Sequence, residues 1–254
     1  FGWHAALFPT GYSGLHKIAV GAWRADSDGP MQVVSGPVGR QKIHFQAPPA
    51  DRVAREMEDF LSWFNDPPPM DGLVRSAIAH LWLVTIHPFE DGNGRIARAV
   101  ADLAIAQMEG SGQRFYSMSA RLQRERAGYY QMLERTQKGS LDVTPWLAWF
   151  LECFSRAIND AETDSARVLR KADFWQRAAR EPLSARQTDI LNRFLDGFEG
   201  HLTARKWASL ARCSVDTAQR DINDLLERHL LIRNPGGSRR TSYRLAGFEP
   251  DGDV

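Results

Sequence analysis

The chain has 254 residues, a length that allows one large domain or two smaller ones. Its composition, 43% apolar and 25% charged, is ordinary for a globular protein, and its net charge of +1 gives no general argument for binding nucleic acid or an acidic membrane. Cys153 and Cys213 lie far apart in apolar helical settings, which predicts buried free thiols in a reducing compartment. No apolar run approaches the roughly 20 residues of a membrane span, so we expect a cytoplasmic protein without membrane contact.

The beginning of the chain predicts a helix and then a β-hairpin. Residues 2–8 follow a helical pattern that Pro9 breaks, and the chain starts at Phe1 without a methionine, so we expect a fragment whose upstream part is missing. Residues 31–46 contain two β-prone runs around a Gly/Pro turn, which predicts a hairpin lying on a helical body with one edge exposed.

Helical spacing dominates the next part of the chain. Apolar residues recur at helical intervals, and Pro145 stands at the first turn of the last helix after the cap Thr144. The predicted helices cover 51–64, 73–85, 96–108, 121–138 and 146–169, with a short extended piece at 115–118. The helix over 73–85 is apolar nearly all round, which predicts a central, buried position.

A different pattern follows Pro182. Short helices are predicted from Ser184, Thr203 and Val215, followed by a hairpin built on residues 230–233 and 241–245. This order of helix, helix–turn–helix and hairpin predicts a winged-helix domain.

The most informative segment is His87-Pro88-Phe89-Glu90-Asp91-Gly92-Asn93-Gly94-Arg95-Ile96-Ala97-Arg98, between two apolar helices. Gly92 and Gly94 at a helix start leave backbone N–H groups open to an anion, and Arg95 and Arg98 share a helix face on which they can hold phosphates. Asp91 offers an oxygen ligand suited to Mg²⁺, and Asn93 is fit to hold a phosphate oxygen or the loop itself. His87 can take a proton from a hydroxyl at neutral pH.

Each of these residues also has a simpler explanation. A histidine before proline often ends a helix, a Gly-Asn-Gly segment is often a turn, and an arginine pair often faces solvent. Together within twelve residues they favour a site, because a structural loop needs neither a histidine nor two arginines. The segment differs from a Walker A loop, since it has no Lys-Ser/Thr pair and no preceding strand.

His-Pro-Phe-x-Asp-Gly-Asn-Gly-Arg-x-x-Arg, from His87 to Arg98, resembles the signature of the Fic (filamentation induced by cAMP) family at every fixed position. The resemblance extends from about Trp3 to Phe154 and looks closest to bacterial Fic proteins with a C-terminal winged helix. It implies a mainly α Fic domain over 1–157, with a flap hairpin at about 31–46 and the motif at 87–98. The residue patterns add a helical linker over 158–182, a winged helix over 183–247 and a flexible tail over 248–254.

The resemblance implies a protein adenylyltransferase, an EC 2.7.7 type nucleotidyltransferase that moves AMP from ATP to a Tyr, Thr or Ser hydroxyl of a target protein. His87 would be the general base, Asp91 would hold Mg²⁺, and the flap would bind the target by strand addition. The nucleotide-contacting residues it implies are Ile43, His44, Phe45, Gln46, Asp91, Gly92, Asn93, Gly94, Arg95, Ile96, Ala97, Arg98, Tyr129, Tyr130 and Gln137. Tyrosines at helical spacing are also typical of a core, so the roles of Tyr129 and Tyr130 stay open.

Many Fic proteins carry an inhibitory helix with a Ser/Thr-x-x-x-Glu-Gly/Asn motif whose glutamate pairs with the second motif arginine, here Arg98. No such segment occurs in this sequence, and we expect it in the missing upstream part.

Several alternatives remain open. Removal of AMP or transfer of another phosphate-containing group is compatible with the motif, and a nucleotide-sensing winged-helix regulator would be a different class of protein. The winged helix would bind DNA through Thr217, Gln219 and Arg220 and through Arg239 and Arg240 at the wing tip. Acidic residues in the same helix equally favour a protein-docking module. Homodimer formation is also left open.

Overall fold

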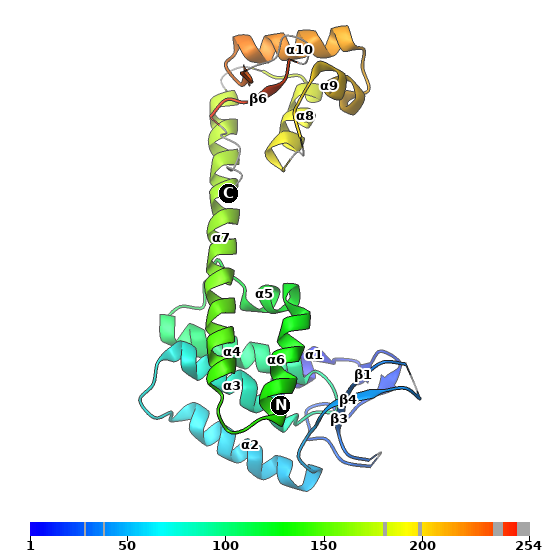
Figure 1. Ribbon diagram of the computed structural model, residues 1–254, viewed down its shortest axis with the longest axis vertical. Helices are drawn as coiled ribbons and strands as arrows, with labels where there is room; N and C mark the ends of the chain where they lie inside the picture. Colours follow the sequence, from blue (N-terminus) through cyan, green and yellow to red (C-terminus); the bar gives the residue numbers. More distant parts are fainter. Residues whose placement is uncertain (28, 38, 180–181, 198–199, 236–240, 248–254) are drawn as a thin grey trace. The chain divides into compact units, whose positions relative to one another are not determined.

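The computed structural model describes residues 1–27, 29–37, 39–179, 182–197, 200–235 and 241–247 (Figure 1). The chain divides into two compact units, Phe1–Glu162 and Thr163–Val254. Each unit has its own hydrophobic core. Helix α7 (Thr144–Ala178) contributes its first part to one core and its last part to the other, so the predicted linker over 158–182 continues this helix as far as Ala178.

The first unit is a set of helices with small hairpins, as the predicted mainly α fold requires. Besides the first part of α7, its elements are α1 (Gly2–Leu7), β1 (Tyr12–Ser13), β2 (His16–Lys17), β3 (Gln32–Ser35), β4 (Lys42–Gln46), α2 (Ala50–Asn65), α3 (Gly72–Ile86), α4 (Asn93–Glu109), α5 (Met118–Arg124) and α6 (Arg126–Lys138). Within the described part of the chain, no helix is both long enough and apolar enough to cross a membrane.

Helix α3 is the centre of the first unit. Asp71 caps it by accepting hydrogen bonds from the N–H groups of Leu73 and Val74, at 2.8 and 3.2 Å. The helix is buried on most of its surface and packs most extensively against α4. From α7, the fully buried Trp146 donates its ring N–H to the carbonyl of Ala77 at 2.9 Å. These contacts fix the position of α3, and the motif follows directly after its last residue, Ile86.

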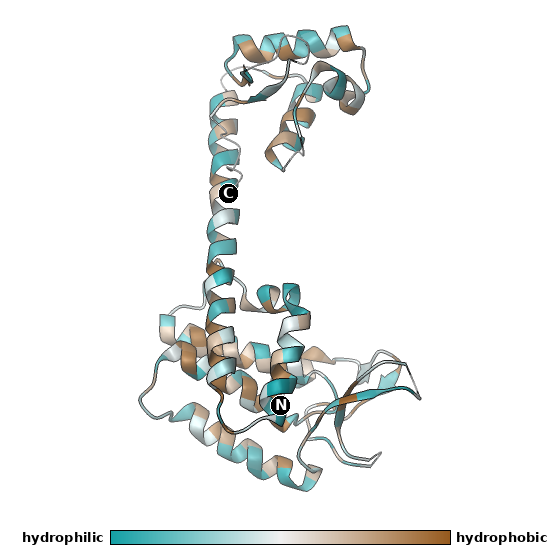
Figure 2. Cartoon of the chain, in the orientation of Figure 1, coloured by the Kyte–Doolittle hydropathy of each residue, from teal (hydrophilic) through white to brown (hydrophobic). Residues whose placement is uncertain are grey.

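The amphipathic helices pack around this centre by one face each. Helix α2 buries Val53, Met57, Phe60 and Phe64, which recur at helical spacing. Figure 2 shows the corresponding mixture of hydrophobic and hydrophilic residues along α2 and along α10 (Val215–Glu227). Burial of such a stripe supplies most of the stability that a surface helix gains from its tertiary packing.

The predicted hairpin is present as the antiparallel pair β3 and β4. Gln32 pairs with Gln46, Val33 with Phe45, Val34 with Ile43 and Ser35 with Lys42, and an irregularity lies between Val33 and Val34. Strand β4 contacts helix α6. The hairpin is therefore attached to the helical body through β4, as a two-stranded sheet needs for stability.

Two of the predicted elements differ in the structure. The single helix expected over 121–138 is divided at Glu125 into α5 and α6. The reason is tertiary: the Glu125 carboxylate accepts hydrogen bonds from Arg156 of α7 at 2.7 and 2.8 Å, and from Arg121 at 2.5 Å. No strand forms over 115–118, where Ser117 instead caps α5 by accepting from the N–H of Ala120.

The second unit follows the predicted order of elements. After the last part of α7 these are α8 (Ala185–Leu195), α9 (Ala204–Ala211), α10 (Val215–Glu227), β5 (Leu231–Arg233) and β6 (Tyr243–Leu245). Ser184, Thr203 and Ser214 cap the three helices, and Ser184 forms a capping box with Gln187. The predicted turn at 236–238, Arg239, Arg240 and the tail from 248 lie outside the described residues.

Candidate active site

A cavity of about 920 Å³ lies where the motif, the hairpin and helix α6 meet. The motif residues that line it are His87, Glu90, Asp91, Gly92, Asn93, Gly94, Arg95 and Arg98. From the hairpin and α6 come Met31, Gln32, Val33, Val34, Ser35, His44, Phe45, Arg126, Ala127, Tyr129, Tyr130, Leu133, Glu134 and Gln137, and α3 adds Val84. The fold thus gathers segments about 100 residues apart in the sequence around one space.

His87 ends α3 with its ring in a defined orientation. Its backbone is left-handed, with φ of 54°, an uncommon conformation for a residue other than glycine. The ring Nδ1–H donates to the carbonyl of Val84 at 3.1 Å, so Nε2 keeps its lone pair. Burial lowers the pKa of His87 below its ordinary value, against the opposing effect of the bond to Val84. At neutral pH this histidine is therefore uncharged and able to accept a proton.

Arg24 holds the backbone of His87 in place, a role that the sequence analysis missed. Its guanidinium is buried and donates to the carbonyl of His87 at 2.7 Å, to the carbonyl of Pro48, and to Asp26 at 2.8 Å. Asp26 in turn accepts from the N–H of Ala50 at the start of α2. An isolated arginine in a loop gives no sequence signal for such a role, because the carbonyls of His87 and Pro48 lie 63 and 24 positions away along the chain.

Asn93 fixes the motif loop from inside. Its side chain is 2% exposed, accepts from the N–H of Phe89 at 2.9 Å, and donates to the carbonyl of Phe89 at 2.7 Å. The sequence left open whether Asn93 holds a phosphate oxygen or the loop. Both ends of its amide are used within the loop, so its contribution to the site is to shape it.

The two glycines of the motif lack a side chain for different reasons. Gly92 precedes α4 with φ of 82°, and a Cβ there would lie 2.8 Å from the ring of Phe8. Gly94 has no such constraint, and a Cβ there would make only an ordinary contact, at 3.6 Å, with Arg98. The absence of a side chain at Gly94 keeps the first turn of α4 open, where free N–H groups and the helix dipole favour an anion.

Asp91 points a carboxylate into the cavity. The hydroxyl of Ser13 donates to its Oδ2, and its own loop provides the N–H of Gly92 to Oδ1 at 2.6 Å. Burial would raise the pKa of Asp91, but these hydrogen bonds and nearby Arg95 together lower it below the usual value. The carboxylate is thus ionised at neutral pH and is half exposed. Ser13 is a second residue that the sequence analysis did not single out.

The two motif arginines are held differently. Arg95 lies over the ring of Phe8, 4.6 Å from its centroid, and 3.6 Å from Asp91. Arg98 lies in the cavity close enough to His80 and Tyr129 to affect their titration, and no hydrogen bond or ion pair is recorded for its guanidinium within the described ranges. A cation in this state at a helix N-terminus is available to an anionic ligand.

The tyrosine pair combines a buried residue with a half-exposed one, and both line the cavity. Tyr129 is buried, and its hydroxyl bonds to the ring Nε2 of His80 at 2.9 Å. Tyr130 is half exposed, and the guanidinium of Arg126 lies over its ring. Gln137 lines the cavity too, but its amide donates to the hydroxyl of Thr85 at 3.0 Å.

Four of the expected nucleotide contacts fall outside the cavity. Ile43 lies half exposed on the outer part of the hairpin, and Gln46 pairs with Gln32. Ile96 and Ala97 are buried in the hydrophobic core. Their places follow from periodicity, since neighbouring residues of a strand or helix point in different directions.

A histidine near the N-terminus supports the same loop. His4 is buried, stacks on Phe89 at 4.1 Å between ring centroids, and donates from Nε2 to the carbonyl of Asp91 at 3.1 Å. Its Nδ1 accepts from the N–H of Gly21 at 3.1 Å. Glu90 binds the N–H of Ala19 at 2.9 Å. The loop preceding the hairpin is thus attached to the motif at several points.

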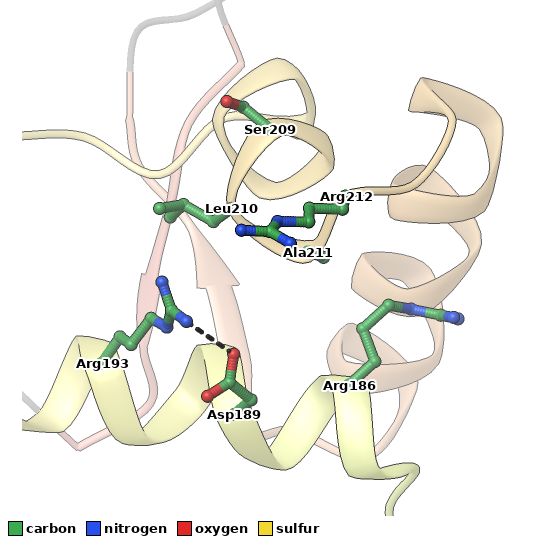
Figure 3. A pocket seen from close by; sticks show the side chains of 7 residues that line it. All are labelled: Arg186, Asp189, Arg193, Ser209, Leu210, Ala211 and Arg212. Atoms are coloured by element: carbon green, nitrogen blue, oxygen red, sulfur yellow. Dashed lines mark ion pairs between the residues drawn. The ribbon is translucent and has the colours of Figure 1, made fainter.

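The second unit contains a separate cavity of about 610 Å³, lined by Arg186, Asp189, Arg193, Ser209, Leu210, Ala211 and Arg212. Figure 3 shows Arg193 directed towards Asp189, with 3.1 Å between them. Arg186 is paired with Asp221 of α10 at 2.6 Å. Two of its three arginines therefore have a carboxylate partner, which reduces the positive field that a phosphate backbone would meet.

The residues expected to read DNA lie at the start of α10. Thr217 is bonded to the cap Ser214 at 2.9 Å, and Gln219 donates to Asn223 at 3.0 Å and to Tyr243 at 3.3 Å. Arg220 is exposed.

Part of the first unit is similar to known proteins. Residues 1–105 match the model of the Fic/DOC family, a range that includes the whole motif. These residues therefore resemble the Fic/DOC family. The chain is 28% identical over 165 residues to "Protein adenylyltransferase fic-1" of Caenorhabditis elegans, which covers 63% of this chain and 30% of that protein. It is 34% identical over 115 residues to "Protein adenylyltransferase Fic" of Nematostella vectensis, a match that covers 44% of this chain and 25% of that protein.

These matches span less than a third of the length of either relative. Among solved structures, a Fic family protein from Desulfovibrio desulfuricans G20 aligns over 98% of this chain and 68% of its own, with a TM-score of 0.53 and 24% identity. This likeness concerns the fold alone.

Proposed function

We propose that this protein is a protein adenylyltransferase that transfers AMP from ATP to a Tyr, Thr or Ser hydroxyl of a target protein. The observation that carries the proposal is His87, a neutral histidine with its Nδ1 occupied by Val84 and its Nε2 free, in a cavity that also contains an open helix N-terminus and two arginines. The names of the adenylyltransferases to which the chain is similar support the same reaction class.

In the proposed reaction the target hydroxyl attacks the α-phosphorus of ATP. The bond to the bridging oxygen of the β-phosphate breaks, pyrophosphate leaves with that electron pair, and Nε2 of His87 takes the hydroxyl proton. The first turn of α4 and the guanidinium groups of Arg95 and Arg98 would stabilise the negative charge of the phosphates. Asn93 and Arg24 keep His87 and this turn at fixed positions.

The donor set fits Mg²⁺. Asp91 presents an ionised, half-exposed carboxylate, and the described residues include no group of three acidic, histidine or cysteine side chains that could form a complete metal site. Mg²⁺ characteristically binds through one or two carboxylates together with phosphates and water, so Asp91 would hold it jointly with the nucleotide. When bound, the ion supplies charge stabilisation at the phosphates.

The hairpin would bind the target. Strand β4 contacts α6, whereas β3 pairs, among the residues that the structure describes, only with β4. The free side of β3 can accept a further strand, a common way of holding an extended peptide without reading its sequence. In this proposal His44 and Phe45 lie beside the nucleotide, and Tyr130 and Gln137 line the same cavity.

Two further candidate activities share the site. Removal of AMP, or transfer of another phosphate-containing group, would use the same anion-binding turn. A regulator that only senses nucleotide is disfavoured, because sensing does not require a free imidazole nitrogen such as Nε2 of His87. The second unit would be a winged helix that binds DNA or docks a protein, and the ion pairs of Arg186 and Arg193 favour protein docking.

The test is labelling of a cell lysate with ATP carrying its label on the α-phosphate. We expect the full chain to label proteins and the His87→Ala variant to lose at least about 100-fold of that rate, the usual contribution of a general base. His16→Ala is the matched control, because His16 is exposed on β2 and outside the cavity. Equal labelling by wild type and His87→Ala would refute the proposed function.

A further inference from the structure

A hydroxyl–imidazole–carboxylate arrangement lies in the same cavity, separate from His87. The hydroxyl of Ser35, at the end of β3, is 2.6 Å from Nε2 of His44 on β4. Nδ1 of His44 is 2.6 Å from Oε2 of Glu134 on α6. All three residues line the cavity, and Figure 1 shows β3, β4 and α6 meeting beside one another.

The order of the atoms is the one that activates a serine. An ionised carboxylate accepts from Nδ1–H of an imidazole, which leaves Nε2 as the acceptor for the serine hydroxyl. Each of the two hydrogen bonds joins different elements, so the arrangement depends on the docking of the hairpin on α6. No linear pattern indicates this arrangement, since the three residues are separated by 9 and 90 positions.

Glu134 is ionised, as the hydroxyl–imidazole–carboxylate arrangement requires. Lys138 donates to its Oε1 at 2.8 Å, and Lys42 lies 3.6 Å from the same oxygen. Hydrogen bonds from Lys138 and His44 lower the pKa of Glu134 to about 2. Its carboxylate is therefore ionised at neutral pH, with Oε2 directed to the imidazole.

Ser35 is exposed to solvent while facing the cavity. It therefore meets two requirements of an acceptor: access to a bound nucleotide and a base within hydrogen-bond reach. The contacts of the hairpin alone would not require a half-buried histidine between a serine and a glutamate, because its strands are already paired along their backbones.

We propose that Ser35 is a self-modification site, an acceptor of AMP on the protein's own hairpin with His44 as its base. The proposal rests on the proposed adenylyl transfer. The Ser35 oxygen attacks the α-phosphorus of ATP bound in the cavity, a phosphoester bond forms, pyrophosphate leaves, and the proton passes to Nε2 of His44. Glu134 is a positioning residue, which orients the imidazole and stabilises its charged form.

Modification would change the face that a target meets. AMP on Ser35 adds a phosphodiester charge and a nucleoside beside the free side of β3. The modified hairpin is expected to accept a target strand less well, so that the reaction limits itself.

The experiment incubates the purified full chain with ATP, Mg²⁺ and a cell lysate, and measures two products in the same tube. One is AMP on Ser35, located by fragmentation mass spectrometry of the tryptic segment 25–40, in which Ser27 serves as an internal control hydroxyl. The other is AMP on lysate proteins. Because the transfer is intramolecular, the Ser35 rate per molecule should not change with protein concentration.

The variants separate the two bases. His87→Ala should lose lysate labelling and keep Ser35 labelling, whereas Glu134→Gln and His44→Asn should lower the ratio of Ser35 to lysate labelling by about 100-fold. Lys42→Gln is the matched control, because Lys42 contacts Glu134 but is not part of the Ser35–His44–Glu134 arrangement. This variant should keep the wild-type ratio of Ser35 to lysate labelling.

The outcomes distinguish the inference from the proposed function. Labelled lysate proteins with unmodified Ser35 would overturn the inference alone. Absence of both products would overturn both. Loss of Ser35 labelling in His87→Ala, or an unchanged ratio in Glu134→Gln and His44→Asn, would reject His44 as the base.

Discussion

Asn93 allows the most direct test of how the motif loop is held. The change Asn93→Ala removes an acceptor from the N–H of Phe89 and a donor to its carbonyl. Phe89 is 4% exposed, so both backbone groups would be left without a partner in a dry environment. An unsatisfied buried group costs about 1–3 kcal/mol, and the two together about 2–6 kcal/mol.

That loss is a large part of the roughly 5–15 kcal/mol by which a domain is stable. We expect the first unit to unfold at lower urea concentration and the second unit to be unaffected. The assay is hydrogen exchange with mass spectrometry during urea titration, which follows peptides of each unit separately. Asn65→Ala, at an exposed position, is the control and should change stability by no more than about 0.5 kcal/mol.

Activity should fall together with stability, because the loop carries His87 and Asp91. An Asn93→Ala protein that loses less than about 1 kcal/mol in the first unit would refute this reasoning. So would unchanged exchange at the amide of Phe89, since that amide is the group exposed by the substitution.

Three further changes test the site. Burial lowers the pKa of His80 to about 3, so the unfolded state binds more protons than the folded state below about pH 6.5. The free energy of unfolding should therefore fall as the pH is lowered from 6.5, by at most about 1.4 kcal/mol per pH unit. His80→Phe should flatten the acidic part of a plot of urea midpoint against pH, and an unchanged plot would contradict this role of His80. Gly92→Ala should strain the left-handed backbone and clash with Phe8, lowering the melting temperature of the first unit, whereas an unaltered melt would show that the loop adapts. Arg24→Lys should lower lysate labelling more than tenfold while ATP binding persists, because lysine cannot span the carbonyl of His87, Pro48 and Asp26 together; full labelling would exclude this supporting role.

The sequence determined much of the helical scaffold. The stripe of α2, the nearly continuous apolar surface of α3 and the caps Ser184 and Ser214 are local signals, because each arises from residues within a few positions of one another. The motif was equally legible, since its glycines, acid, base and arginines all lie within twelve residues.

Other features depended on contacts between distant segments. Only the fold revealed that Arg24 supports His87 and that Glu125 divides a predicted helix by pairing with Arg156. These interactions join charged or polar side chains to backbone groups or partners tens of residues away. A linear pattern cannot specify them, because it carries no information about which elements pack together.

The sequence by itself determined the family signature, the mainly helical fold and the residue types of the active loop. Tertiary structure decided which of these residues face the cavity and which form its frame: Ile96 and Ala97 are core, whereas Glu134 and Ser35 reach the cavity from other elements. The physical reason is that local sequence sets the direction of each side chain relative to its own helix or strand, while the packing of α3, α4, α6 and the hairpin sets what that direction meets.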